Sequence, residues 1–328
     1  MPNSTFPAVI SFGDNKKPII SARFGDENDE DFSTRMENAI EVQEIAPNLY
    51  LSKELWLPAG ARGVFGGQIV AQALRAAFYT VGEEFEIHSL HSYFILAGSV
   101  DTPVVYQVQR IREGRSYATR YVTASQKGKA IFVCSCSFAK PDTKNLNLSH
   151  QVEMPIVPPP ETYPSEQEAF AEFLTRDDLA PKYREAMEQR MMETSPVDFR
   201  HCHVPGELTG FRYFKTRGKL RNDKVLHACV IAYASDHAFI NAATDANAVP
   251  MNAIGMLTSL DHCIWFHSNA RTDEWLLYDM HSPRASNGRG IVFGRIYAAD
   301  GTLVATTSQE GIMRLTEKEQ ENRMKSKL

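Results

Sequence analysis

The sequence predicts an α+β protein of two similar halves, in each of which one long helix lies against a curved antiparallel sheet. Three observations support this prediction. A helical period of apolar residues runs from Gly63 to Val81, and several strand-like runs follow it. The same order of elements then returns about 170 residues later. A duplicated unit, with one sheet wrapped around one helix in each copy, accounts for all three.

The first half spans residues 40–149 and begins its helix at a pair of glycines. Gly66 and Gly67 precede an apolar face made of Ile69, Val70, Ala73, Leu74, Ala77 and Phe78. The strand-like runs that follow are HSLHSYFILA, TPVVYQVQRIRE, SYATRYVTASQ and KAIFVCSCSF. Turn signals separate them at Gly98, Gly114 and Lys127–Gly128.

The second half spans residues 205–317 and repeats this order. We expect its helix to begin near Asp236. The expected strands are LTSLDHCIWFH, EWLLYDMHS, GIVFGRIYAA and TLVATTSQEGIMRL. The turn at Asp300–Gly301 corresponds to Lys127–Gly128 of the first half.

Three further segments flank or join the halves. Residues 1–39 carry the acidic run GDENDEDF with little apolar periodicity, so we expect most of them to be mobile. Residues 150–204 begin with the proline-rich MPIVPPPETYP and continue into two helices, the first with a capping box at Ser165 and Glu168. We expect this connector to run over the surface, where it covers either a sheet edge or a substrate entrance. Residues 318–328 form a polar tail.

The composition is that of a globular protein with a substantial core. Hydrophobic residues make up 43 % and charged residues 23 % of 328 residues. A net charge of −5 without a basic stripe argues against binding to nucleic acid. No apolar run approaches the roughly 20 residues that cross a bilayer, and the N-terminus does not resemble a secretory signal. The five cysteines include Cys134 and Cys136 in one strand-like run, which favours free thiols in a reducing compartment.

The C-terminal tripeptide Ser326-Lys327-Leu328 is a peroxisomal address. The residues before it are polar, so the tripeptide is expected to be accessible to a peroxisomal import receptor. We therefore expect the protein in the peroxisomal matrix.

Familiar cofactor and nucleophile motifs are absent from the sequence. It contains no phosphate-binding glycine loop, no G-x-S-x-G and no HExxH. His201 and His203 flank Cys202, but neighbouring residues of a strand point to opposite sides, so we expect no metal site there. Packed or hydrogen-bonded strand histidines are the expected role of His88, His91, His262 and His267. We expect neither a cofactor nor a metal ion.

Three polar residues of the second half lie where burial is expected. Asp236 stands at the expected helix start, where an acidic residue is usually a cap. Ser259 begins the strand-like run that follows, and Gln309 lies near the end of the last one. Each has a structural explanation, and spacing alone does not join them into a site.

Six segments in order resemble the acyl-CoA thioesterase II family, which includes peroxisomal enzymes. They are FGGQIVAQAL, HSLHSYF, MPIVPPPE, AYASDHAF, SLDHCIWFH and SQEGIMR, and the resemblance covers about residues 40–320. The family has a double hot-dog fold, in which two fused domains each wrap a curved antiparallel sheet around a long helix. Its members hydrolyse fatty acyl-CoA thioesters to free acid and coenzyme A, so the resemblance implies an acyl-CoA substrate.

The resemblance also implies the catalytic residues. The family uses an Asp, a Thr or Ser, and a Gln to position and polarise a water molecule, and the matching positions are Asp236, Ser259 and Gln309. A carboxylate accepts the proton of the attacking water while hydroxyl and amide groups orient it. A helix N-terminus would keep Asp236 ionised, and backbone N–H groups at Gly66–Gly67 are candidate oxyanion donors. Direct attack by the carboxylate remains an alternative.

The duplication predicts one active site per chain. The offset places Gly66 opposite Asp236 and Cys136 opposite Gln309, so the first half lacks both the carboxylate and the amide. Ser89 stands opposite Ser259. The first half is then expected to supply shape and contacts to coenzyme A.

Two other functions and the assembly state stay open. A hot-dog enoyl-CoA hydratase needs an Asp/His arrangement that the sequence does not show. A non-catalytic acyl-CoA-binding protein is disfavoured because all three polar residues are retained. Exposed sheet edges favour a homodimer, although the fused halves already form the usual hot-dog pair.

Overall fold

The computed structural model describes residues 9–12, 18–21, 29–142, 148–177, 179, 181–193, 195–202, 209–249 and 251–325. The tripeptide Ser326-Lys327-Leu328 and His203 lie outside these described residues. Among the helices of the described part, none is long and apolar enough to span a bilayer.

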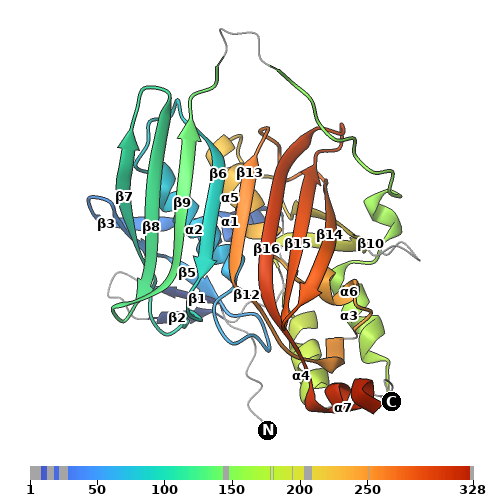
Figure 1. The fold of residues 1–328 in the computed structure, drawn as a ribbon. Helices are drawn as coiled ribbons and strands as arrows, with labels where there is room; N and C mark the ends of the chain where they lie inside the picture. The colour runs from blue at the N-terminus through green and yellow to red at the C-terminus, as the bar shows by residue number, and fades with distance from the viewer. Residues whose placement is uncertain are drawn as a thin grey trace.

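One curved antiparallel sheet dominates the molecule (Figure 1). It has 13 strands in the order β10-β11-β14-β15-β16-β13-β6-β9-β8-β7-β4-β3, and β12 pairs with β16 beside this path. The strands of the first half are β3 (Val42–Ala46), β4 (Leu49–Ser52), β6 (Glu86–Phe94), β7 (Val105–Glu113), β8 (Tyr117–Gln126) and β9 (Lys129–Ala139). Those of the second half are β10 (Val197–Cys202), β11 (Thr209–Thr216), β12 (Ile254–Ser259), β13 (Asp261–Phe266), β14 (Leu276–Ser286), β15 (Arg289–Tyr297) and β16 (Leu303–Leu315).

The two halves meet in the middle of this sheet. β6 pairs antiparallel with β13, from Tyr93 opposite Asp261 to Ser89 opposite Trp265. The predicted strands form, except that the run LTSLDHCIWFH is divided at Leu260 into β12 and β13. The two halves join edge to edge into one surface. The hairpin turns at Lys127–Gly128 and Asp300–Gly301 also form as predicted, with positive φ at both glycines.

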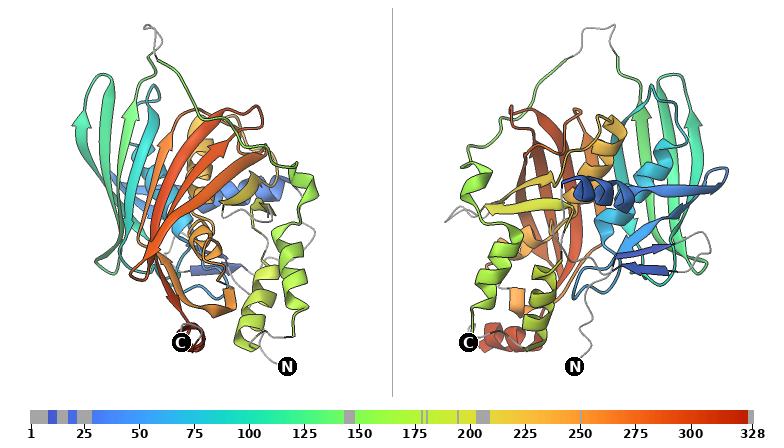
Figure 2. Two further views of the ribbon diagram at one scale, coloured as in Figure 1. Left: turned by 45° about the vertical axis from the view of Figure 1, so that its right-hand side comes forward. Right: turned by 180° about the vertical axis from the view of Figure 1, so that it is seen from behind.

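Two central helices, α2 (Gly66–Phe78) and α5 (Lys224–Ser235), pack against each other on the hollow side of the sheet (Figure 2). The prediction of α2 is confirmed, and its apolar face is buried. The prediction of a helix beginning near Asp236 is wrong, because α5 begins after Asp223 and ends just before Asp236. Every residue of α5 from Leu226 to Ser235 is buried. Apolar residues therefore lie on all sides of the helix, and the sequence lacks the periodicity that marks a helix with one apolar face.

Asp236 and Gly66 are consequently not counterparts in the two halves. α2 begins at Gly66 and α5 at Lys224, whereas Asp236 follows the end of α5. The second half contains extra residues between its helix and its strands, including α6 (Asn241–Asp245) and the short 3₁₀ turn Met251–Ala253. Because of this insertion, the spacing of about 170 residues that relates the strands of the two halves does not relate Asp236 to Gly66.

The N-terminal region differs in part from the expected mobile segment. Helix α1 (Asp29–Ile40) buries Met36 and Ile40 in the main core, so the second part of 1–39 is packed. Short strands β1 (Val9–Phe12) and β2 (Pro18–Ser21) form a small separate sheet with β5 (Glu54–Trp56).

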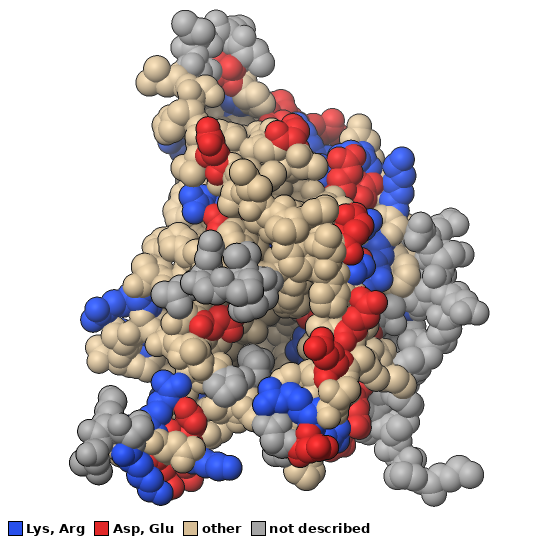
Figure 3. Space-filling model, turned by 90° about the vertical axis from the view of Figure 1, so that its right-hand side faces the viewer, with Lys and Arg blue, Asp and Glu red and all other residues tan. Residues whose placement is uncertain are grey.

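The segment 150–204 contains a 3₁₀ turn (Pro160–Thr162) and the helices α3 (Glu166–Leu174) and α4 (Pro181–Met191). The capping box of Ser165 and Glu168 forms as predicted. One boundary differs, because β10 is the edge strand of the large sheet and lies inside the range assigned to the connector. The last helix of the described residues is α7 (Glu317–Lys325). On the connector side of the molecule, acidic and basic side chains are interspersed among other residues (Figure 3).

Candidate active site

Asp236 and Gln309 meet although they are 73 residues apart in the chain. Asp236 follows the last residue of α5, and Gln309 lies on β16 with its side chain facing the helices. The Gln309 Nε2 donates a hydrogen bond of 2.6 Å to Asp236 Oδ1. Gln309 is buried, whereas Asp236 keeps part of its surface accessible.

A chain of hydrogen bonds fixes the orientation of the Gln309 amide. Its Nε2 also donates to His262 Nδ1 at 3.2 Å, and His262 Nε2 lies 2.9 Å from Ser235 Oγ. Burial lowers the pKa of His262 to about 3, so its ring is neutral and donates from Nε2. Both Gln309 N–H groups are thereby used. Among the described residues, the buried Gln309 Oε1 has no hydrogen-bond partner, so its capacity to accept is unused.

The environment of Asp236 raises its pKa to about 6, chiefly through burial. Hydrogen bonds from Gln309 and from the backbone N–H of Gly67 oppose this shift. The expectation that the N-terminus of its own helix keeps Asp236 ionised is wrong, because Asp236 lies at the C-terminal end of α5. The helix N-terminus that faces it is that of α2, from the other half.

The glycine pair allows α2 to approach Asp236 closely. A Cβ on Gly66 would lie 2.7 Å from Asp236 Oδ2, and a Cβ on Gly67 would overlap the backbone carbonyl of Tyr233 in α5. The residue before the helix, Phe65, provides no side-chain cap. The start of α2 therefore presents backbone N–H groups to the site, beside the carboxylate.

Ser259 is the third predicted residue, and the structure places it on the neighbouring strand. It lies at the end of β12 opposite Gly311, and since Gly311 is two residues from Gln309, both side chains share one face. Residues in such a diagonal pair are separated by about 7–8 Å, and their Cβ atoms by somewhat less. Within the described part of the chain, Ser259 makes no hydrogen bond to Asp236 or Gln309.

His262 and Ser235 are site residues that sequence reasoning did not select. His262 belongs to the segment SLDHCIWFH, and its expected role as a hydrogen-bonded strand histidine is confirmed. The strand alternation places it on the buried face, but its partner Ser235 is 27 residues away on another element. Only the fold shows that this histidine supports Gln309.

The other predicted strand histidines lie away from this site. His88 contacts Ser137 Oγ at 2.8 Å, and His267 contacts Thr306 Oγ1 at 2.8 Å. His91 packs edge-on against Trp265. Among the described residues, no group of three or more His, Cys, Asp or Glu side chains is placed to hold a metal ion. All five cysteines are free.

Comparison with known proteins gives consistent matches in both halves. A family model described as acyl-CoA thioesterase matches residues 184–312, and one described as acyl-CoA thioesterase N-terminal domain matches residues 53–139. Acyl-coenzyme A thioesterase 8 of Mus musculus is 36 % identical over 89 % of this chain and 92 % of its own length. The chain belongs to the acyl-CoA thioesterase II family. It is a thioester hydrolase with the double hot-dog fold.

Other relatives extend this result to bacteria and yeast. Acyl-CoA thioesterase 2 of Haemophilus influenzae is 33 % identical and aligns over 79 % of this chain and 90 % of its own. A peroxisomal acyl-coenzyme A thioester hydrolase of Saccharomyces cerevisiae is 26 % identical over 85 % of this chain and 94 % of its own. The crystal structure of the acyl-CoA thioesterase II TesB2 from Mycobacterium marinum superimposes with a TM-score of 0.69 at 32 % identity, over 86 % of this chain and 99 % of that one.

Proposed function

We propose that this thioesterase hydrolyses fatty acyl-CoA in peroxisomal lipid metabolism, with a water molecule activated by Asp236, Ser259 and Gln309. The observation that carries the proposal is the contact between Gln309 and Asp236 beside the start of α2, whose Gly67 N–H donates to Asp236. It supports a site with a base, an orienting amide and oxyanion donors within one small volume.

Asp236 acts as the general base in the proposed reaction. A water held by Asp236 and by Gln309 Oε1 attacks the thioester carbonyl carbon, and its proton passes to the Asp236 carboxylate. The negative charge that develops on the carbonyl oxygen is stabilised by the backbone N–H of Gly66 at the start of α2, since the N–H of Gly67 already donates to Asp236. Collapse of the tetrahedral intermediate breaks the carbon–sulfur bond, and the departing thiolate of coenzyme A takes the proton. The Ser259 hydroxyl helps to orient the water from the adjacent strand.

The structure offers a physical reason for one active site per chain. At the opposite end of the helix pair, the carboxylate of Asp223 accepts from the N–H groups of Val225 and Leu226 and so occupies the start of α5. Cys136 lies as far beyond the turn at Gly128 as Gln309 lies beyond the turn at Gly301, so it is the counterpart of Gln309, and it is buried. That end therefore lacks an amide beside a carboxylate base.

A thiol-release assay with acyl-CoAs of graded chain length tests the proposed activity. Release of free coenzyme A that disappears in Asp236→Ala supports it. Hydration of a trans-2-enoyl-CoA without thiol release would instead indicate a hydratase, and tight binding without either reaction would indicate a silent acyl-CoA binder. Isolation of a covalent acyl-enzyme would replace water activation by direct carboxylate attack.

The peroxisomal assignment rests on the C-terminal Ser326-Lys327-Leu328 and on the peroxisomal yeast relative. Fluorescent fusions that keep the native C-terminus should accumulate in peroxisomes. Removal of the last three residues should leave the fusion outside them, because the import receptor reads this tripeptide. Equal distribution of both fusions would refute the assignment.

A further inference from the structure

Glu166, the first residue of the connector helix α3, reaches the residue next to Asp236. Its Oε1 accepts a hydrogen bond of 2.9 Å from His237 Nε2, and the two side chains are only 13 % and 6 % exposed. Burial alone would raise the pKa of Glu166, but its contacts with His237 and His201 hold that pKa well below its usual range. Burial lowers the pKa of His237, so a neutral ring donates to a charged carboxylate.

Further contacts hold His237 in place. Its ring stacks on Phe199 of β10 with centroids 4.0 Å apart, and its backbone carbonyl accepts a hydrogen bond from the buried Arg212. The next residue, Ala238, has a φ of 50°. A non-glycine residue keeps this left-handed conformation only where its surroundings impose it. Contacts therefore hold the segment that follows Asp236 in place, and Glu166 of α3 supplies one of them.

At its other end the connector contacts the loop before Gly66–Gly67. Glu193 follows α4, and its Oε1 accepts a hydrogen bond of 2.5 Å from the backbone N–H of Ala59. A Cβ on Gly60 would lie 3.3 Å from the Cβ of Ala186 in α4, so helix and loop are in contact. Burial raises the pKa of Glu193 to about 7, although Arg190 and the N–H of Ala59 oppose this.

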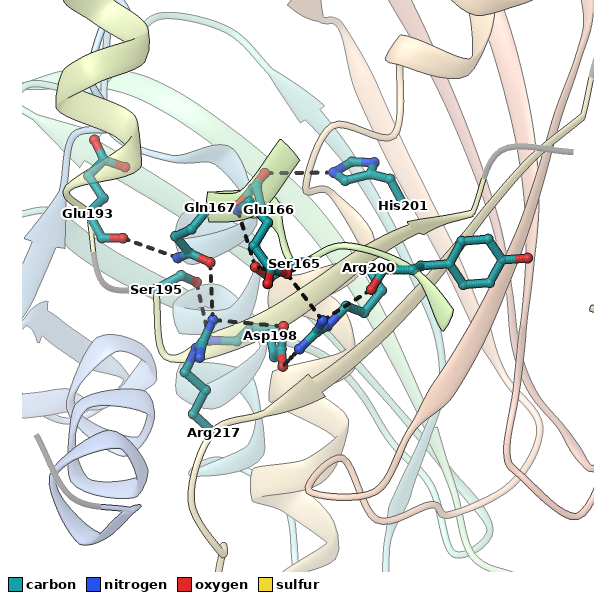
Figure 4. A network of polar contacts seen from close by, with 12 residues as sticks. Ser165, Glu166, Gln167, Glu193, Ser195, Asp198, Arg200, His201 and Arg217 are labelled. Atoms are coloured by element: carbon teal, nitrogen blue, oxygen red, sulfur yellow. Dashed lines mark hydrogen bonds and ion pairs between the residues drawn. The ribbon is translucent and has the colours of Figure 1, made fainter. Parts of the chain in front are cut away.

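The two contact points are linked to each other and to the large sheet (Figure 4). Gln167 of α3 donates from Nε2 to the backbone carbonyl of Glu193 at 3.4 Å and accepts from Arg217 at 3.3 Å. On β10, Arg200 donates to the carbonyl of Tyr163 at 3.1 Å and pairs with Asp198 at 3.1 Å. The connector is thus anchored on the second half while its end reaches the first.

We propose that the connector sets the distance between Asp236 on one side of the active site and Gly66–Gly67 on the other. Glu166 and Glu193 are the positioning residues. Glu166 acts through His237 on Asp236, and Glu193 acts through the 57–65 loop on Gly66–Gly67. The two sides come from different halves of the chain, and the hydrogen bond between Asp236 and Gly67 forms only when they keep this relative position. This inference rests on the proposed role of Asp236 as the base.

Substitutions of the two glutamates should lower kcat and leave KM within about twofold. Glu166→Ala removes the acceptor of a buried N–H, so Asp236 shifts relative to the glycines, and misplacement by about 1 Å costs up to 10²-fold in rate. Glu166→Gln keeps an acceptor oxygen and should retain most of kcat. Glu193→Ala and Glu193→Gln should show the same contrast.

The experiment measures kcat and KM for acyl-CoA hydrolysis by the full-length protein, with amide hydrogen exchange followed by mass spectrometry. Exchange should accelerate at residues 236–240 in Glu166→Ala and at residues 57–65 in Glu193→Ala. Glu172→Ala and Glu188→Ala are matched controls, because these glutamates lie on exposed faces of α3 and α4. Both controls should behave as the wild type.

Unchanged kcat in both alanine variants, or a rise in KM alone, overturns the proposal. If an alanine variant does not fold, Glu166→Asp and Glu193→Asp replace it, since they keep the charge and shorten its reach. These must then lower kcat at constant KM, or the proposal fails. Asp236→Asn in the same assay separates the two levels. If Asp236→Asn keeps full activity, the proposed role of Asp236 as the base is refuted. If Asp236→Asn loses activity while the Glu166 and Glu193 variants keep the wild-type kcat, only the positioning role is refuted.

Discussion

At the scale of single residues, the unusual feature is a carboxylate without a cationic partner. Within the described structure, Asp236 is bound by the amide of Gln309 and the N–H of Gly67, both neutral. Neutral donors do not compensate fully for the loss of water, so the pKa rises to about 6. A general base works best when its pKa is near the working pH, so this environment suits catalysis near neutrality.

Asp236→Asn should lower kcat/KM by at least about 10²-fold, because an amide accepts no proton from water. The wild-type kcat/KM should fall as pH drops through about 6, where Asp236 becomes protonated. A pH profile of the wild type and of the residual activity of the variant checks this. An acid limb that persists unchanged in Asp236→Asn would assign it to another group.

The same pKa shift predicts a pH dependence of stability. The folded pKa of about 6 lies above the ordinary value of 3.8, so ionisation of Asp236 destabilises the fold as pH rises through this window. Each pKa unit corresponds to about 1.4 kcal/mol, which gives at most about 3 kcal/mol in total. Urea unfolding at pH 4 and pH 7.5 should show Asp236→Asn gaining stability relative to wild type at the higher pH. An equal difference at both pH values contradicts the shift.

At the scale of elements, the site depends on the close approach of α2 and α5. The start of α2 lies beside the end of α5, so the two helices run antiparallel. Glycine at positions 66 and 67 leaves room for the Asp236 carboxylate and for the Tyr233 carbonyl. Since the two contacts differ in kind, substitutions at the two glycines should have different consequences.

Gly66→Ala should reduce activity more than stability. Its Cβ would meet the movable Asp236 carboxylate at 2.7 Å, so the side chain is displaced and kcat falls. Gly67→Ala should instead lower the melting temperature, because its Cβ would meet backbone of α5 that cannot yield without separating the helices. Thermal unfolding and thiol release on both variants test this contrast. If Gly66→Ala and Gly67→Ala lowered the melting temperature equally, the predicted difference between the two glycines would be wrong.

At the scale of the whole molecule, the proposed active site belongs to neither half alone. Asp236 and Gln309 come from the second half, whereas Gly66–Gly67 come from the first. The β6–β13 pairing and the connector hold the halves together. Fusion of two hot-dog units thus allows one end of the helix pair to keep the polar groups while the other end loses them.

Active-site titration should therefore find one site per chain. The counterpart of Gln309 beyond the corresponding hairpin turn is the buried Cys136, so the opposite end lacks the amide. A tight, non-hydrolysable acyl-CoA analogue should bind with a stoichiometry of one in calorimetry, and Asp236→Asn should not create a second class of sites. A stoichiometry of two would refute the prediction.

The sequence by itself determined α2, most of the strands and their hairpin turns, and through six family segments it led to Asp236 and Gln309 as proposed site residues. These features depend on local periodicity, turn chemistry and motifs, which are properties of neighbouring residues. Only the tertiary structure decided where α5 begins, because a helix buried on all sides has no polar face to reveal it. It also decided the partners of the candidate site, since His262–Ser235, Gln309–His262 and Gln309–Asp236 join residues 27, 47 and 73 positions apart. Such hydrogen bonds follow from how helices pack on a sheet, and that packing has no local signature.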